Sequence, residues 1–237
     1  IVLDFLSLYP SIIKKFNVSP DSMLLDSNLK EKYHEAPNGA KFIFEDEYEG
    51  VFPTVIKNLL EARQRAKKEM KISSGEEKEM LHARQHALKI LANSFYGYCG
   101  YVRARLFAAD VANAITSYGR ENLERTKKLI EEKFSVEVIY GDTDSIFIKS
   151  STKNLDEAWQ LGEKISSSIS RESKLVLEFE KIYKTFLILT KKRYAGWKFE
   201  KTDNTWHDTI EMKGIETVRR DWCPLVSEVM QDILNII

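Results

Sequence analysis

The middle of the chain holds two short β-forming runs on either side of a polar segment. Val136–Ile139 precede the segment, Ile146–Ile148 follow it, and Tyr140–Ser145 (YGDTDS) lie between them. Two such runs joined by so short a connection favour an antiparallel β-hairpin. That hairpin would hold the carboxylates of Asp142 and Asp144 close together at its tip.

Two carboxylates at this spacing have two interpretations. They repel each other, and each raises the pKa of the other unless a cation lies between them. A hard divalent cation such as Mg²⁺ takes oxygen ligands and keeps room for water and phosphates. The alternative is a plain turn, in which the side chains of Asp142 and Asp144 cap their own backbone. The hairpin alone leaves the two interpretations even.

The opening residues add a third carboxylate. Ile1–Phe5 is an apolar run in which Asp4 is the single charge, and a turn with Pro10 follows. A charge in a buried strand is costly unless it is paired. If this strand lies beside the hairpin, three carboxylates are enough to hold two metal ions about 3.5–4 Å apart, an arrangement that serves phosphoryl transfer. A salt bridge or a helix cap formed by Asp4 is the alternative.

The composition limits the class of protein. The 237 residues have a net charge of zero, and their apolar and charged fractions are typical of a soluble globular chain. The sequence has no apolar run of about 18 residues, which a membrane helix needs, and we expect no signal peptide. Cys99 and Cys223 match no metal-binding spacing, which favours free thiols in a reducing, intracellular compartment. Basic residues gather in 57–71 and 181–201, which predicts local basic patches.

The periodicity predicts a mixed set of elements. Pro53 begins a helix that Ser73–Gly75 interrupts before a second helix, and this pattern indicates an antiparallel helical hairpin. We expect residues 14–50 to be rich in loops. Runs of strands with helices on one face favour an α+β fold. The expected helices cover about 53–72, 76–95, 107–133, 155–172 and 225–237, and the expected strands 175–189 and 195–212, the latter with a turn at Thr202–Asn204.

The predicted helical hairpin carries cations at helical spacing. Arg63 and Lys67 are four positions apart, and Lys89, Asn93 and Tyr96 follow the same rule on the second helix. Cations directed to one place suit an anion such as a triphosphate, which Arg binds as a fork and Lys as a point charge. The alternative for each residue alone is a solvated helix face, and for Tyr96 a place in the core.

Two further groups of polar residues could bind a ligand. The run Lys191–Tyr194 (KKRY) follows an apolar strand, and bases with an aromatic side chain suit a nucleic-acid backbone with a nearby sugar or base. A solvated strand end is the alternative. His82 and His86 are also four positions apart, but the sequence offers no third ligand, so we interpret them as surface residues and not as a zinc site.

Five of these segments together resemble the family B (α-like) DNA polymerases. They occur in the family's order and span nearly the whole chain, and with Cys223–Val226 they are most similar to cellular archaeal and eukaryotic members. The first palm motif corresponds to Asp4–Ile13, the fingers motif to Lys89–Gly97 and the second palm motif to Tyr140–Ser145. The primer-contact motif corresponds to Lys191–Tyr194, and the entry to the thumb to Lys213–Glu216 with Arg219–Asp221.

The resemblance implies an α+β architecture. It implies a palm with an antiparallel β-sheet backed by helices, an antiparallel two-helix fingers hairpin and the start of a helical thumb. The implied palm covers 1–52 and 101–212, the fingers 53–100 and a truncated thumb 213–237. We expect the chain to be part of a longer protein, without the exonuclease domain and most of the thumb of the family, and weakly active at best in isolation.

The resemblance also implies roles for single residues at the reaction centre. Asp4, Asp142 and Asp144 would hold two Mg²⁺ ions, with Asp4 and Asp144 as the principal ligands. Lys89 would bind the triphosphate and donate a proton to the leaving group. Tyr9 would act as a steric gate against a 2′-hydroxyl, and Leu8 would support it. The triphosphate would be contacted by Arg63, Lys67 and Asn93. Tyr96 would lie against the nascent base pair.

The remaining implied roles concern DNA and partners. Glu178 or Glu180 would belong to an accessory acid site. The implied activity is template-directed DNA synthesis on primer–template DNA from deoxynucleoside triphosphates, with pyrophosphate release. In the full-length protein a sliding clamp or other replication subunits would join it, in the nucleus of a eukaryote or the nucleoid of a prokaryote, with no membrane partner. The implied DNA-binding residues are Thr143, Lys191, Lys192, Arg193 and Tyr194.

Three rival interpretations remain. Another two-metal nucleotidyltransferase, such as a reverse transcriptase or an RNA polymerase, fits Tyr9 and the helical cations less well. An inactive polymerase-like scaffold has no reason to keep all three palm acids. A two-metal nuclease does not need helices that bind a triphosphate.

Overall fold

The computed structural model describes residues 1–25, 32–173, 175–203, 205–219 and 221–236. They form two compact units, each described by itself below. The helical unit is Leu6–Glu124, and the sheet unit combines Ile1–Phe5 with Arg125–Ile237. Helix α4 (Ala109–Phe134) contributes residues to both. The division into palm, fingers and thumb at the predicted boundaries stays a prediction.

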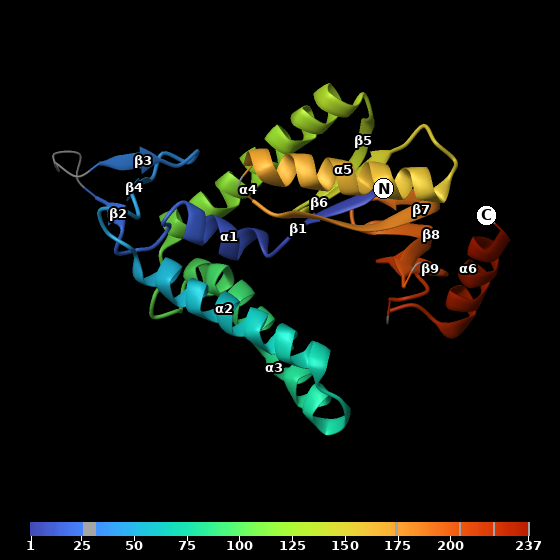
Figure 1. The fold of residues 1–237 in the computed structure, drawn as a ribbon, viewed down its shortest axis with the longest axis horizontal. Helices are drawn as coiled ribbons and strands as arrows, with labels where there is room; N and C mark the ends of the chain where they lie inside the picture. Colours follow the sequence, from blue (N-terminus) through green and yellow to red (C-terminus); the bar gives the residue numbers. More distant parts are fainter. Residues whose placement is uncertain (26–31, 174, 204, 220, 237) are drawn as a thin grey trace. The chain divides into compact units, whose positions relative to one another are not determined.

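The sheet unit is built on six antiparallel strands in the order β5-β6-β1-β7-β8-β9 (Figure 1). The first strand of the chain, β1, lies between β6 and β7. Its residues Val2, Leu3 and Phe5 are almost fully buried, which suits a strand covered on both faces. The strands are β1 (Val2–Phe5), β5 (Glu137–Asp142), β6 (Ser145–Lys149), β7 (Leu177–Thr190), β8 (Arg193–Thr202) and β9 (Thr205–Lys213).

Besides the end of α4, two described helices belong to the sheet unit. Asn154 accepts hydrogen bonds from the backbone N–H groups of Asp156 (2.8 Å) and Glu157 (3.3 Å), as a side-chain cap at a helix start does. Helix α5 (Leu155–Ser173) follows and lies along the sheet (Figure 1), where Trp159 packs edge-on against Phe179 of β7 at 4.6 Å between ring centroids. Helix α6 (Pro224–Ile236) begins at a proline, whose missing N–H costs nothing there.

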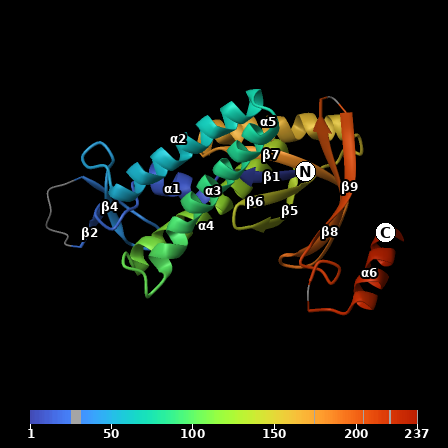
Figure 2. The ribbon, with the colours of Figure 1, turned by 90° about the horizontal axis from the view of Figure 1, so that it is seen from below.

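The helical unit is dominated by a long helical hairpin. Helices α2 (Val51–Ile72) and α3 (Gly75–Gly100) run side by side in opposite directions (Figure 2). Gly75 adopts a left-handed φ of 58° after the break, which glycine does without steric cost. The predicted hairpin is confirmed, although α2 begins two residues before Pro53 and α3 continues through Gly97. The shorter helix α1 (Leu8–Lys15) and the first part of α4 complete the set.

The described residues between 14 and 50 are mostly loops and turns, so the expected loop-rich segment is confirmed, although short strands interrupt it. Three short strands form a separate antiparallel sheet in the order β2-β4-β3. The buried amide of Asn17 links the segment, because its Nδ2 donates to the carbonyls of Ile43 (2.9 Å) and Tyr48 (2.7 Å) and its Oδ1 accepts from the N–H of Gly50 (2.9 Å). The strands are β2 (Met23–Leu24), β3 (Tyr33–Glu35) and β4 (Lys41–Ile43).

The mixture of helices and antiparallel sheets confirms the α+β class. The turn at Thr202 is also confirmed, since β8 and β9 pair up to Thr202 and Thr205; Asn204 lies outside the described residues. Within the described ranges, none of the helices has both the length and the apolar content that a membrane crossing requires.

Candidate functional site

The acidic hairpin is tighter than the sequence predicts. Strand β5 extends through Asp142 and β6 begins at Ser145, so Thr143 and Asp144 alone form the loop. Thr143 has a left-handed φ of 55°, as two-residue hairpin loops commonly require. The N–H of Asp144 donates to the carbonyl of Asp142 at 2.6 Å, and Ser145 Oγ donates to the same oxygen at 3.1 Å. The predicted hairpin is confirmed, with Tyr140 in the strand and not in the turn.

The third carboxylate lies next to this loop. Asp4 is aligned with Ser145 on β6 and with Glu178 on β7, and the N–H of Phe5 donates to the carbonyl of Asp144 at 2.8 Å. The condition set by the sequence, that the opening strand lies beside the hairpin, is therefore met. Neighbouring strands bring the backbones of Asp4 and Asp144 together, with Glu178 on the far side of Asp4.

The environment of Asp144 disfavours its charged form. Burial raises the pKa of Asp144 above its ordinary value, and repulsion from Asp142 and Glu180 adds to the rise. The charge of Lys192 acts in the opposite direction. A carboxylate that is partly removed from water beside other acids gains from any cation that reaches it.

Lys192 supplies one cation to the hairpin. Its Nζ lies 2.7 Å from Oδ2 of Asp142, and its backbone N–H donates to the hydroxyl of Tyr140 at 2.9 Å. Lys192 has a left-handed φ of 65°. Gly214 stands directly against it, since a Cβ at that position would lie 2.3 Å from the carbonyl oxygen of Lys192. The tight loop thus fixes the backbone of Lys192, while its exposed side chain reaches the acid.

The donor set fits a hard divalent cation in its chemistry. Asp4, Asp142 and Asp144 carry the carboxylate oxygens that Mg²⁺ prefers, and Asp142 also pairs with Lys192. No three His, Cys, Asp or Glu side chains in the described part of the chain are grouped so that they could hold a metal ion. The three-carboxylate metal site therefore stays a prediction.

The other residues of the predicted primer-contact motif differ in their surroundings. Arg193 donates to the buried carboxylate of Glu216. The ring of Tyr194 packs against other aromatic rings, among them Phe186 at 5.3 Å and Phe147 at 5.5 Å between centroids, and burial raises its pKa. Lys191 is exposed. The motif is thus anchored to the sheet unit by Arg193 and Tyr194.

In the helical unit, two tyrosines predicted to contact the nucleotide meet. Ser7, with a left-handed φ of 50°, precedes α1. The ring of Tyr9 on α1 lies 4.7 Å from the ring of Tyr96 on α3, tilted by 55°. The guanidinium of Arg63 on α2 reaches Ser7 Oγ at 3.4 Å and Gln85 Oε1 at 3.5 Å. Helices α2 and α3 therefore converge on the start of α1.

The remaining predicted residues of the helical unit divide by exposure. Leu8 is buried, as a residue that supports Tyr9 would be. Lys67, Lys89 and Asn93 are exposed on α2 and α3. Their side chains are therefore accessible to an anion, and their role as triphosphate ligands stays a prediction.

Sequence reasoning did not foresee three contacts that hold predicted site residues in place. Glu216 binds Arg193, Gln85 binds Arg63, and the backbone of Gly119 lies against Tyr9. A glycine inside a long helical pattern was the one available signal, because such a glycine usually has a packing reason. Glu216 lies in the predicted thumb-entry motif, but nothing in that motif pairs it with Arg193, and Gln85 carries no local signal.

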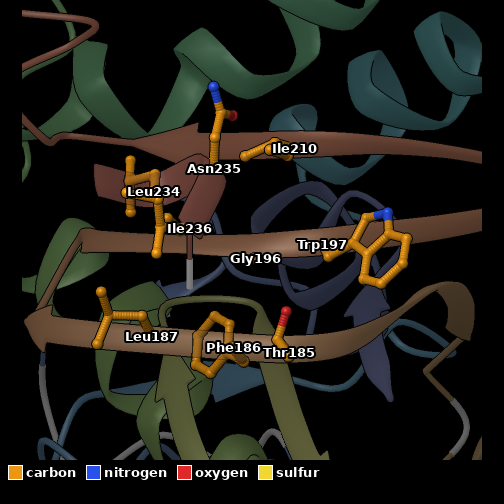
Figure 3. A pocket seen from close by; sticks show the side chains of 10 residues that line it. Thr185, Phe186, Leu187, Gly196, Trp197, Ile210, Leu234, Asn235 and Ile236 are labelled. Atoms are coloured by element: carbon orange, nitrogen blue, oxygen red, sulfur yellow. The ribbon is translucent and has the colours of Figure 1, made fainter. Parts of the chain in front are cut away.

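The sheet unit also has an apolar pocket of about 510 Å³ between the β7–β9 ribbon and α6 (Figure 3). Phe186 and Leu187 line it from β7, Trp197 from β8, Ile210 from β9 and Leu234 from α6. None of the ten residues that line the pocket is among the predicted catalytic or binding residues. The pocket is therefore no part of the candidate site.

The chain is similar to known proteins over its whole length. The profile of DNA polymerase family B matches residues 1–237. The DNA polymerase delta catalytic subunit of Schizosaccharomyces pombe is 41% identical over 98% of this chain and 23% of its own length. That of Glycine max is 40% identical over 98% of this chain and 23% of its own. The chain thus spans about a quarter of the length of these relatives.

A solved structure agrees with the sequences. The family B DNA polymerase from the hyperthermophilic archaeon Pyrobaculum calidifontis superimposes with a TM-score of 0.75 at 33% identity, over 100% of this chain and 29% of that one. The resemblance found in the motifs is thereby confirmed, and the chain belongs to family B of the DNA polymerases.

Proposed function

We propose that the chain carries the nucleotidyl-transfer residues of a DNA-directed DNA polymerase. The reaction adds a deoxynucleotide to the 3′ end of a primer, as a template directs, and releases pyrophosphate. The observation that supports this most is the position of Asp4, on β1, beside Asp144, in the loop at the tip of the acidic hairpin. Family membership gives the reaction class, and the acids give the place for its chemistry.

The sheet unit is proposed to act on the primer end. Two bound Mg²⁺ ions would lower the pKa of the primer hydroxyl and stabilise the charge of the leaving pyrophosphate. Asp4 and Asp144 would hold these ions, and Asp142 would join them on release from Lys192. Lys192 and Lys191 would then bind primer phosphates, and Thr143, exposed at the tip, would lie near the primer terminus.

The helical unit is proposed to bind the incoming nucleotide. Arg63, Lys67, Lys89 and Asn93 would bind the triphosphate, because phosphoryl transfer depends mainly on position and charge. Lys89 would also give a proton to the oxygen of the leaving pyrophosphate. Tyr9 would lie against the sugar, where its ring excludes a 2′-hydroxyl, and its neighbour Tyr96 would lie against the new base pair.

The biological setting is proposed from the relatives. Several of the similar proteins are delta catalytic subunits of eukaryotes, which supports a role in nuclear DNA replication. Primer–template DNA and deoxynucleoside triphosphates would be the substrates, and a sliding clamp or other replication subunits the partners. Division into palm, fingers and thumb at 1–52, 53–100, 101–212 and 213–237 belongs to the same proposal.

Single-nucleotide incorporation by the full-length natural protein tests this function. We expect template-dependent addition of a deoxynucleotide and poor addition of a ribonucleotide, and we expect Tyr9→Ala to admit the ribonucleotide. A protein that prefers ribonucleotides, or that adds nucleotides without a template, would contradict the proposal. The result separates a DNA polymerase from an RNA polymerase, and both from a scaffold that only binds DNA.

A further inference from the structure

A glycine occupies the interior of α4. Gly119 lies well inside the 26 residues of Ala109–Phe134 and is buried. Glycine destabilises a helix interior relative to alanine, because it loses more backbone freedom on folding. A glycine at such a position therefore calls for a packing explanation.

The explanation is a close approach of α1. A Cβ at position 119 would lie 3.3 Å from Cε1 of Tyr9, 3.8 Å from Ile12 Cδ1 and 3.9 Å from Leu8 Cδ2. Non-bonded carbon atoms are at their best separation at about 3.5–4.0 Å. The two aliphatic contacts would be ordinary, and the contact with Tyr9 alone would be too short. Cε1 is next to the ring carbon that bears the hydroxyl, so the contact is at the outer end of the ring.

Further packing limits how the ring can move. Tyr96 lies 4.7 Å from the Tyr9 ring. The residues that flank Tyr9 on the inner side of α1 are fixed as well, since Leu8 is 3% exposed and Ile12 is 0% exposed. A methyl group at position 119 would therefore press on a ring that is already packed, and relief of the short contact must displace the ring by a few tenths of an ångström.

We propose that Gly119 positions the Tyr9 ring and thereby sets how the nucleotide site fits the sugar. The inference rests on the proposed function, in which Tyr9 lies against the sugar of the incoming nucleotide. Gly119 contacts the ring and no substrate, so it is a positioning residue. A methyl group there should alter the sugar fit of the nucleotide and leave the acids of the sheet unit unchanged.

The test is a double-mutant cycle in the full-length natural protein. Single-nucleotide incorporation is measured for wild type, Gly119→Ala, Tyr9→Ala and the double variant, with a deoxynucleotide and a ribonucleotide. We expect Gly119→Ala to raise the KM for the deoxynucleotide and to change the ratio of the two kcat/KM values by roughly 2–10-fold, the equivalent of moving a side chain off its rotamer. In the Tyr9→Ala background the same substitution should change neither quantity.

Gly100→Ala is the matched control. Gly100 also lies in a helix, α3, and a Cβ there would meet only Ala112 Cβ, at an ordinary 3.7 Å. The control adds the same methyl group to a helix, at its last residue, without touching Tyr9. We expect it to keep the wild-type KM and the wild-type ratio.

Thermal unfolding gives a readout that does not need activity. If the methyl group collides with Tyr9, removal of the ring should relieve the collision. The change in melting temperature caused by Tyr9→Ala should therefore be more favourable in the Gly119→Ala protein than in the wild type. The inference is overturned if this rescue is missing, if Gly119→Ala has wild-type KM and selectivity, or if its effect persists without the Tyr9 ring. A wild-type protein that incorporates no nucleotide would refute the proposed function instead, and the unfolding cycle would still test the contact.

Discussion

The ammonium group of Lys192 lies 2.7 Å from Oδ2 of Asp142, across 50 positions of the sequence. Lys192 thus neutralises one of the acids that are proposed to bind metal, and it comes from the motif proposed to bind the primer. A cation that binds Asp142, or a primer phosphate that binds Lys192, must break this pair. In the proposed function, the pair would therefore couple metal binding to the primer-contact motif.

Lys192→Ala should strengthen divalent-metal binding by the protein without DNA. The side chain of Lys192 is largely exposed, and exposed ion pairs contribute about 0.2–1 kcal/mol. Removal of the competing ammonium should therefore lower the dissociation constant of Mg²⁺ by no more than about fivefold, as calorimetry would measure it. Lys191→Ala removes a neighbouring positive charge and should leave the metal affinity nearly unchanged. Equal affinities in Lys192→Ala and wild type would show that the pair does not compete with metal.

Arg63→Ala should weaken nucleotide binding. A hydrogen bond to a charged group contributes about 1.5–3 kcal/mol, so we expect the KM for the deoxynucleotide to rise by at least about tenfold. Arg65 is exposed on the same helix, two positions away and hence on a different face. Arg65→Ala should keep the wild-type KM, and an equal loss in both variants would point to general charge rather than to a directed contact.

Arg193→Ala should destabilise the protein even without DNA. The substitution leaves the buried carboxylate of Glu216 without its guanidinium, and an unsatisfied buried polar group costs about 1–3 kcal/mol. Chemical denaturation would show this loss. Arg193→Ala with Glu216→Ala should be more stable than Arg193→Ala alone. Wild-type stability of the single variant would mean that Arg193 serves DNA binding only.

An ion pair across β7 and β9 should make stability depend on pH. Nζ of Lys181 lies 2.9 Å from Oε2 of Glu211, to which the hydroxyl of Tyr183 also donates. Burial acts to raise the pKa of Glu211, but the partners outweigh it and hold the pKa below its ordinary 4.5. The pair therefore stabilises the fold above pH 4.5, and this contribution is lost as the pH falls from there through the lower pKa of the folded state.

The comparison with Glu211→Gln isolates this contribution. The variant should be less stable at neutral pH, because Lys181 loses its counter-charge. Below pH 4.5 its melting temperature should fall less steeply than that of the wild type. Parallel curves over this range would show that Glu211 does not carry the acid dependence.

The elements with a strong local signal were predicted from the sequence. The acidic hairpin, the α2–α3 hairpin and the β8–β9 hairpin all follow from periodicity and turn residues close together in the chain. The strands β2 to β4 were missed because two or three residues are too few for an alternating pattern. The buried hub of Asn17 that holds their segment depends on partners 26 to 33 positions away.

In the candidate site, too, the residues were predicted from the sequence, but several of their contacts were not. Its residue types and spacing identified Asp4, Asp142 and Asp144, and the pairing of β1 with β6 confirmed that Asp4 and Asp144 are neighbours. The pairing of Asp142 with Lys192, of Arg193 with Glu216, and of Tyr9 with Gly119 arises from tertiary contacts. No local sequence pattern predicts such contacts, because the two partners of each pair lie far apart in the chain.

The most direct test of the central claim is single-turnover nucleotide incorporation by Asp144→Asn, measured beside primer–template binding. The change keeps the side chain's size and removes the charge that would hold Mg²⁺. Loss of even an outer partner of a metal ligand costs roughly 10–100-fold, so we expect the rate to fall more than about a hundredfold with DNA binding retained. The control Glu137→Gln, at an exposed position on β5, should keep the wild-type rate. A wild-type rate in Asp144→Asn, or a natural protein that binds DNA and incorporates nothing, would contradict the account.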